Sequence, residues 1–109
     1  MDLQQTLEEV FPESTGAAQL EQLGLFTLIF AMENDPEPLT AARVAERTGL
    51  PRSHVDQLVR KLIALNVVSR TRAPGPGGVR ALRLRIKHSA ASRKLLAAIE
   101  EGAIRKPSR

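Results

Sequence analysis

The sequence predicts one small, mainly α-helical domain that carries a single β-hairpin. The first observation is length, because 109 residues suit one ordinary domain and are too few for two. The second is the hydrophobic pattern, which has the helical period over most of the chain and alternates strictly only near residues 79–87. The third is that proline, glycine and asparagine separate the periodic segments at short intervals.

Two helices are predicted in the N-terminal third of the chain. Apolar residues within 1–11 recur along one helical stripe, and a break that contains Pro12 follows them. Ser14 or Thr15 can accept a hydrogen bond from the first free N–H groups of a second helix. This second helix is expected to span about 16–34.

The second predicted helix has an extensive apolar surface. Residues 25–32 are apolar on almost every side, so the helix must be covered on every side. The cover could come wholly from its own chain or in part from a second subunit, and the sequence leaves both readings open. The run Asp35-Pro36-Glu37-Pro38 is expected to end the helix, because proline lacks the backbone N–H donor and restricts its predecessor.

Two shorter helices with a tight turn between them are predicted next. Thr40 can cap the first, which ends near Thr48, and Gly49 suits the left-handed conformation that closes a helix. Pro51 suits the first turn of the following helix, which is expected to run to about Leu65. Its apolar residues fall within one arc of the helical wheel and its polar residues fall on the opposite arc.

A β-hairpin follows this pair of helices. Its predicted arms are 67–72 and 79–87, joined by a tip rich in proline and glycine. In the second arm the alternation places Leu82, Leu84 and Ile86 on one face and basic residues on the other.

A final helix is expected to begin after Ser89, which can cap it. It should span about 90–101 and end at Gly102, before a frayed basic tail over 104–109. The predicted order is therefore four helices, a hairpin and one more helix.

Composition excludes several kinds of chemistry. The chain has no cysteine, which removes disulfides, thiol nucleophiles, zinc fingers and iron–sulfur clusters. With only His54 and His88, and with no nucleophile–base pattern, neither an enzyme, a metal site nor a cofactor is expected. No apolar run approaches about 18 residues and no signal peptide is visible, so the sequence predicts a cytoplasmic protein without a membrane span.

Charge is divided unequally along the chain. Residues 1–51 carry nine acidic and two basic residues, a formal charge of −7, whereas 52–109 carry three acidic and fourteen basic residues, a charge of +11. Between 52 and 87, nine basic residues accompany Asp56 as the one acid. Such an excess indicates a polyanionic partner or a solvated face, and the acidic remainder favours a partner that is bound on one side only.

The order of the elements is that of a winged helix-turn-helix, in which the hairpin is the wing. A helix fits the major groove of B-form DNA, where its first turns meet the edges of the bases. Arg52, Ser53 and Gln57 occupy those turns, whereas Arg60 and Lys61 lie farther along, where phosphates come within reach.

The stretch LTAARVAERTGLPRSHVDQLVRKLIALNVVSR, residues 39–70, resembles the DNA-binding core of the MarR (multiple antibiotic resistance regulator) family and its winged-helix relatives. In that family a leucine–threonine entry and an alanine–glutamate–arginine helix precede a glycine–leucine turn, a recognition helix and a valine-rich strand. The resemblance implies a dimeric transcriptional regulator, expected here to be a repressor. With the basic wing included, the candidate DNA-binding residues are Arg52, Ser53, His54, Gln57, Arg60, Lys61, Arg70, Arg72 and Arg80.

Three departures from the MarR pattern matter. Asn66 replaces the usual glycine before the strand, and asparagine tolerates the same left-handed conformation. By the resemblance, the family's wing arginine falls on Arg72 or Arg80, but the wing tip has prolines and glycines in place of an acid–arginine pattern. The chain is also short for the family, with little room for long dimerisation helices.

We expect a single domain in which 1–34 and 89–104 flank the DNA-binding helix-turn-helix and wing at 39–87. The flanking helices should join two copies into a homodimer, as the terminal helices do in the similarly small ArsR-type regulators. No polar cluster identifies a small-molecule effector.

Two other functions are alternatives to DNA binding. The first is a winged helix that contacts another protein, which the basic face at 52–87 disfavours, because that face suits phosphates better than an apolar partner. The second is a binder of double-stranded RNA, which the narrow major groove of A-form RNA disfavours.

Overall fold

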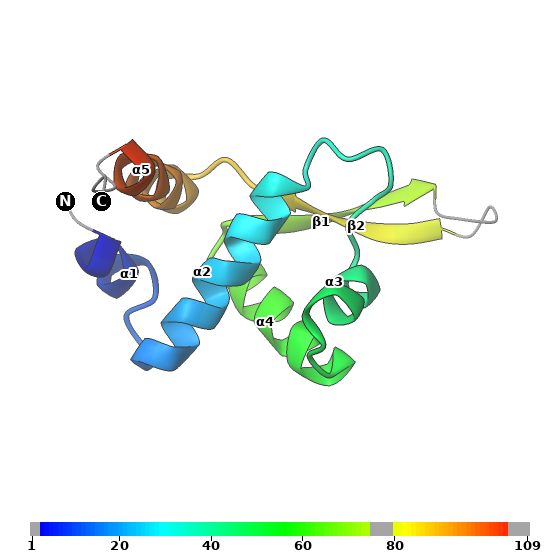
Figure 1. The fold of residues 1–109 in the computed structure, drawn as a ribbon, viewed down its shortest axis with the longest axis horizontal. Coiled ribbons are helices and arrows are strands. Elements are labelled where there is room, and N and C mark those ends of the chain that lie inside the picture. Colours follow the sequence, from blue (N-terminus) through cyan, green and yellow to red (C-terminus); the bar gives the residue numbers. More distant parts are fainter. Residues whose placement is uncertain (1–2, 75–79, 105–109) are drawn as a thin grey trace, which may run out of the picture.

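The computed structural model of the chain describes residues 3–74 and 80–104. Figure 1 shows α2 crossing the middle of the molecule, with α3 and α4 on one side, the hairpin extending to one end, and α1 and α5 together at the other end. This arrangement confirms the predicted winged helix-turn-helix. The elements are α1 (Leu3–Val10), α2 (Gly16–Ala31), α3 (Ala41–Thr48), α4 (Arg52–Ala64), β1 (Val68–Pro74), β2 (Arg80–Ile86) and α5 (Ala90–Ile104).

Buried polar side chains fix the turn between α1 and α2. The Thr15 hydroxyl caps α2 by accepting from the Ala18 N–H at 3.3 Å, whereas Ser14 accepts from the Gln22 side chain at 2.8 Å. The amide of Gln19 donates to the Phe11 carbonyl at 3.1 Å. Both glutamines are buried, so these bonds satisfy donors that water cannot reach.

Helix α2 ends at Ala31, earlier than the sequence indicated. Beyond it, the N–H groups of Glu33 and Asp35 bond to carbonyls three residues back, which tightens the backbone out of the α-helix. The Glu33 carboxylate accepts from the Ile86 N–H at 3.0 Å, so the end of α2 is tied to β2. A long-range contact thus ends the helix before the prolines do.

One hydrophobic core collects side chains from all seven elements. Phe26 and Ile29 of α2 and Leu95 of α5 are completely buried in it. The chain itself therefore covers much of the apolar stretch 25–32, but Phe30 remains 49% exposed and Leu20, near the start of α2, remains 64% exposed. Cover by its own chain therefore holds for Phe26 and Ile29, and cover by a second subunit stays a prediction for the side chains left exposed.

The short helices form where the sequence places them. Thr40 caps α3 by accepting from the Arg43 N–H at 3.2 Å, and Gly49 closes it at φ +75°. Asn66 has φ +66°, as expected for the residue that takes the place of a glycine. Pro51 stands one position before the first turn of α4, at its N-cap, where its carbonyl accepts from the N–H groups of His54 and Val55.

The hairpin pairs its strands in antiparallel register from Val68 opposite Ile86 to Pro74 opposite Arg80, so the first strand is longer than expected. Residues 75–79, which include most of the predicted tip, lie outside the described residues. Leu84 and Ile86 are buried, but Leu82 is 48% exposed. All three share one face of the strand, as predicted, but only Leu84 and Ile86 reach the core.

Arg83 is not part of a free basic face, contrary to the charge pattern. Its Nη2 atom donates to the carbonyls of Glu33 at 2.8 Å and Asp35 at 2.7 Å. The neighbouring Leu84 N–H donates to the Leu39 carbonyl at 2.8 Å. Strand β2 is thus bonded to the loop between α2 and α3, and Arg83 holds that loop against the wing.

Helix α5 packs against α1 and continues past Gly102 to Ile104, so the predicted end at this glycine was wrong. Ser89 caps it, as its hydroxyl accepts from the Ser92 N–H at 3.1 Å. An ion pair between Lys94 and Glu9, 3.0 Å apart, joins the two helices at the surface.

Arg83 and Arg85 lie two residues apart on one face of β2 and offer a matched test of the loop contact. Arg83→Ala should lower the free energy of unfolding by about 1.5–3 kcal/mol, because two carbonyls lose a charged donor. The exposed Arg85→Ala should stay within about 0.5 kcal/mol of the unmodified protein. Urea denaturation followed by far-ultraviolet circular dichroism measures both, and equal effects would contradict a structural role for Arg83.

Candidate nucleic-acid interface

Helix α4 is divided lengthwise into a buried and an exposed side, as its helical wheel predicts. Val55, Leu58, Val59 and Leu62 are buried. The opposite side is polar, cationic and open to solvent. It consists of Arg52, Ser53, Gln57, Arg60, Lys61 and Ala64, all of them exposed. The small side chain of Ala64 leaves room for a partner to approach the backbone.

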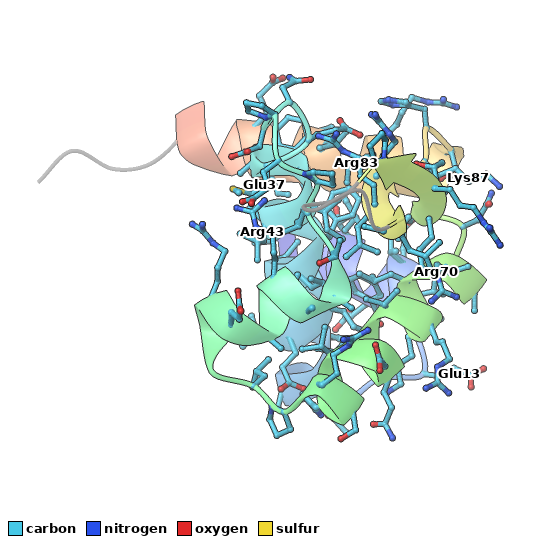
Figure 2. The ribbon with its side chains drawn as sticks, turned by 90° about the vertical axis from the view of Figure 1, so that its right-hand side faces the viewer. Glu13, Glu37, Arg43, Arg70, Arg83 and Lys87 are labelled. Carbon is cyan, nitrogen blue, oxygen red and sulfur yellow. The ribbon has the colours of Figure 1, made fainter. Side chains whose placement is uncertain are left out.

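The hairpin presents two arginines on the face that looks towards α4. Arg70 pairs with Leu84 and Arg72 pairs with Leu82, so both share the face that carries the buried apolar residues of β2. Both arginines are exposed. Figure 2 shows Arg70 on the side of α4 and Arg83 on the side of the α2–α3 loop.

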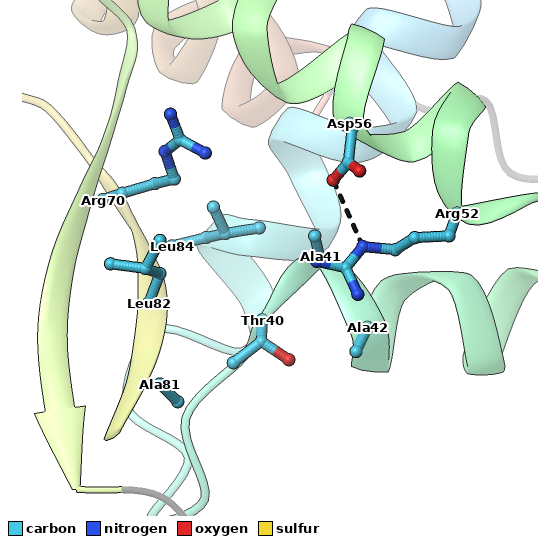
Figure 3. A pocket seen from close by; sticks show the side chains of 9 residues that line it. All are labelled: Thr40, Ala41, Ala42, Arg52, Asp56, Arg70, Ala81, Leu82 and Leu84. Atoms are coloured by element: carbon cyan, nitrogen blue, oxygen red, sulfur yellow. Dashed lines mark hydrogen bonds and ion pairs between the residues drawn. The ribbon is translucent and has the colours of Figure 1, made fainter. Parts of the chain in front are cut away.

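A groove of about 280 Å³ lies between the hairpin and the two short helices. Figure 3 shows Arg52 of α4 reaching over it from one wall and Arg70 of β1 from the other. The Thr40 hydroxyl and the first turn of α3 form its floor, and half-exposed Leu82 forms part of the wing wall. Two cationic side chains from elements distant in sequence therefore converge on one concave surface.

Arg52 is not free within the groove. Its Nε atom donates to Oδ1 of Asp56 at 3.2 Å, in the ion pair that Figure 3 marks with a dashed line. Asp56 is not among the residues expected to bind DNA, although the sequence carries a signal for this contact. Its signal was the spacing of four residues from Arg52, which brings two side chains together on a helix surface.

His54 lies apart from the other candidates on α4. Its Nε2 atom is 2.8 Å from a carboxylate oxygen of Glu21, which belongs to α2. The contact turns the imidazole towards α2 and away from Gln57 and Arg60. Of the remaining candidates, Arg80 begins β2, but its side chain lies outside the described residues.

One of the two basic residues of the acidic N-terminal half, Arg43, is held in internal contacts. Arg43 pairs with Glu37 at 3.4 Å and donates to the Glu37 carbonyl at 2.8 Å, and Figure 2 shows the two side chains at the edge of the α2–α3 loop. Because Glu37 neutralises its charge, Arg43 does not add to a positive surface. The exposed cations nearest the groove therefore belong to α4 and the wing.

Two searches of the described residues concern other kinds of site. Within 3–74 and 80–104, no group of three or more histidine, aspartate or glutamate side chains is arranged to hold a metal ion. Nor does any helix in the same part of the chain have the length and apolar character to cross a membrane.

Known proteins resemble this chain in sequence and in fold. Residues 26–77, a little under half of the chain, match the model of the MarR family. A possible transcriptional regulator from Methanosarcina mazei Go1 has a TM-score of 0.55 at 15% identity, over 94% of this chain and 81% of the other.

The PcaV transcriptional regulator from Streptomyces coelicolor, in complex with its natural ligand, has a TM-score of 0.50 at 24% identity, over 98% of this chain and 75% of the other. At these identities the two structures show a shared fold. Among proteins with curated functions, no sequence match was found.

Proposed function

We propose that the chain is a MarR-like winged helix-turn-helix protein that regulates transcription by binding double-stranded DNA at specific sequences, as a repressor. One observation carries the proposal. The exposed cationic side of α4 and the wing arginines face the same side of the molecule, with Arg52 and Arg70 on opposite walls of one groove.

In the proposed complex α4 lies in the major groove. Its first turns, with Arg52, Ser53 and Gln57, face the base edges, while Arg60 and Lys61 meet phosphates. Arg70 and Arg72 place the wing on the flanking backbone. His54 is held by Glu21 and would join the interface only by leaving that contact.

The second candidate function is a protein-interaction module without DNA reading. The observation that favours it is the exposed Leu82 in the groove, since an apolar side chain suits a protein partner better than a phosphate. Five exposed cationic or polar side chains on α4 favour DNA instead, because an apolar partner surface would leave their charges unpaired.

We further propose that two copies form a homodimer through the N-terminal and C-terminal helices. Support comes from the exposed apolar side chains of α2, Leu20 and Phe30. Leu95 of α5 cannot contribute, because it is fully buried in its own chain, and Leu96 and Ile99 are partly used in the same core. The apolar surface left for a partner therefore lies more on α2 than on the terminal helix.

Binding to duplex DNA of random sequence tests the proposal most simply. If about six phosphates are neutralised per dimer, the logarithm of the binding constant should fall against the logarithm of the salt concentration with a slope of about −5. Fluorescence anisotropy of a labelled duplex gives this slope. A slope near zero would contradict phosphate contacts and favour the protein-interaction module.

Gln57 and Lys61 allow base reading and phosphate binding to be separated. On a site selected from a random duplex library, Gln57→Ala should cost about 1–3 kcal/mol of binding free energy, with little loss on random DNA. Lys61→Ala should weaken both complexes alike, because a phosphate contact carries no sequence information. If Gln57→Ala weakens binding to both DNAs equally, Gln57 does not recognise bases.

Multi-angle light scattering tests the dimer. The unmodified protein should have twice the mass of one chain at high micromolar concentration, and Leu20→Glu with Phe30→Glu should give a folded monomer, because both positions are already exposed in one chain. Two recognition helices about 34 Å apart also predict a palindromic site. Detection needs refractive index, since the chain lacks Trp, Tyr and Cys. The mass of a single chain would overturn the dimer.

A further inference from the structure

Asp56 is unexpected on a surface that would face DNA. It is the one acidic residue between 52 and 87, and its side chain is 35% exposed on the wall of the groove. A carboxylate close to phosphates weakens binding by repulsion. Asp56 therefore does not increase the affinity for DNA, and it must have another role.

The Arg52–Asp56 pair is poorly arranged for stabilising the helix. A salt bridge four residues apart on a helix is more favourable when the acid comes first. Here the base is at the first position of α4, close to the positive end of the helix dipole. Both side chains are also partly exposed, at 59% for Arg52, so solvent screens their attraction.

The geometry of the pair instead suits base recognition by Arg52. Asp56 engages Nε, and within the described residues Nη1 and Nη2 of Arg52 have no hydrogen-bond partner. These two atoms form the fork that binds the O6 and N7 atoms of guanine in the major groove. A held guanidinium also loses less conformational entropy on binding than a free, exposed one.

We propose that Asp56 is a specificity-determining residue, which positions the Arg52 guanidinium for guanine and whose charge weakens binding wherever Arg52 finds no guanine. The inference rests on the proposed function. On a cognate site, Arg52 remains paired with Asp56 and gains two acceptors from the base. On other DNA the same carboxylate faces the backbone without that gain.

The experiment compares four variants, Asp56→Glu among them, with the unmodified protein. Asp56→Asn removes the charge at nearly constant shape, Arg52→Ala removes the base reader, and Glu100→Gln removes one charge from the exposed surface of α5 as a matched control. Each protein selects duplexes from a random library, which gives the base preference at every position. Salt titrations on random duplex then measure non-specific affinity, and circular dichroism checks folding.

Asp56→Asn and Arg52→Ala should lose the preference for guanine at the same position of the site. Asp56→Asn should also bind random duplex about 3–10 times more tightly, since one repulsive charge is gone. Asp56→Glu should restore part of the preference, because its carboxylate can still reach Arg52. Glu100→Gln should change neither quantity.

Three results would overturn the inference. If Asp56→Asn keeps the guanine preference, Asp56 does not position Arg52, while the proposed function stands. If Asp56→Asn weakens binding to random and selected DNA equally, its role is structural. If the unmodified protein shows no salt-dependent binding to any duplex, the proposed function is wrong, and so is this inference.

Discussion

Burial of one side of α4 determines the orientation of everything exposed on its other side. Val55, Val59 and Leu62 are at most 1% exposed within the common core, which also holds Phe26 of α2 and Val44 of α3. A helix of this length is marginal in water by itself, and the shorter α3 is more so. Tertiary packing therefore creates the helices, and the polar side of α4 has a fixed direction because its apolar side is held.

The wing is attached to this framework at both of its faces. On one face, Leu84 and Ile86 enter the core beside α4. On the other, Arg83 binds the carbonyls of Glu33 and Asp35, while Arg43 holds the far side of the same loop through Glu37. These contacts hold β2, one wall of the groove, against the α2–α3 loop.

Local sequence signals predicted much of this arrangement. Neighbouring residues alone predict the left-handed Gly49 and Asn66, the cap at Thr40 and the two sides of α4. They left the cap of α2 open between Ser14 and Thr15. The sequence could not reveal that Arg83 turns inward, since its partners lie 48 and 50 residues away.

The local hydrophobic pattern also could not predict which apolar side chains are exposed to solvent. Leu82 alternates in phase with Leu84 and Ile86, yet it lies past the end of the helices that cover them. The same applies to α5, where Leu95 is covered by its own chain although its pattern resembled that of a subunit contact. The spacing of four residues on one helix could have predicted the contact between Arg52 and Asp56, but not the effect of this contact on DNA binding.

The central claim is that the exposed side of α4 enters the major groove of duplex DNA. Titration of an isotope-labelled sample with a short selected duplex, followed by two-dimensional amide NMR, tests it directly in a chain of 109 residues. The account predicts the largest shifts at Ser53, Gln57 and Arg60, smaller shifts along β1, and none in α1. Shifts concentrated in α1 and α5, or none at low salt, would contradict it.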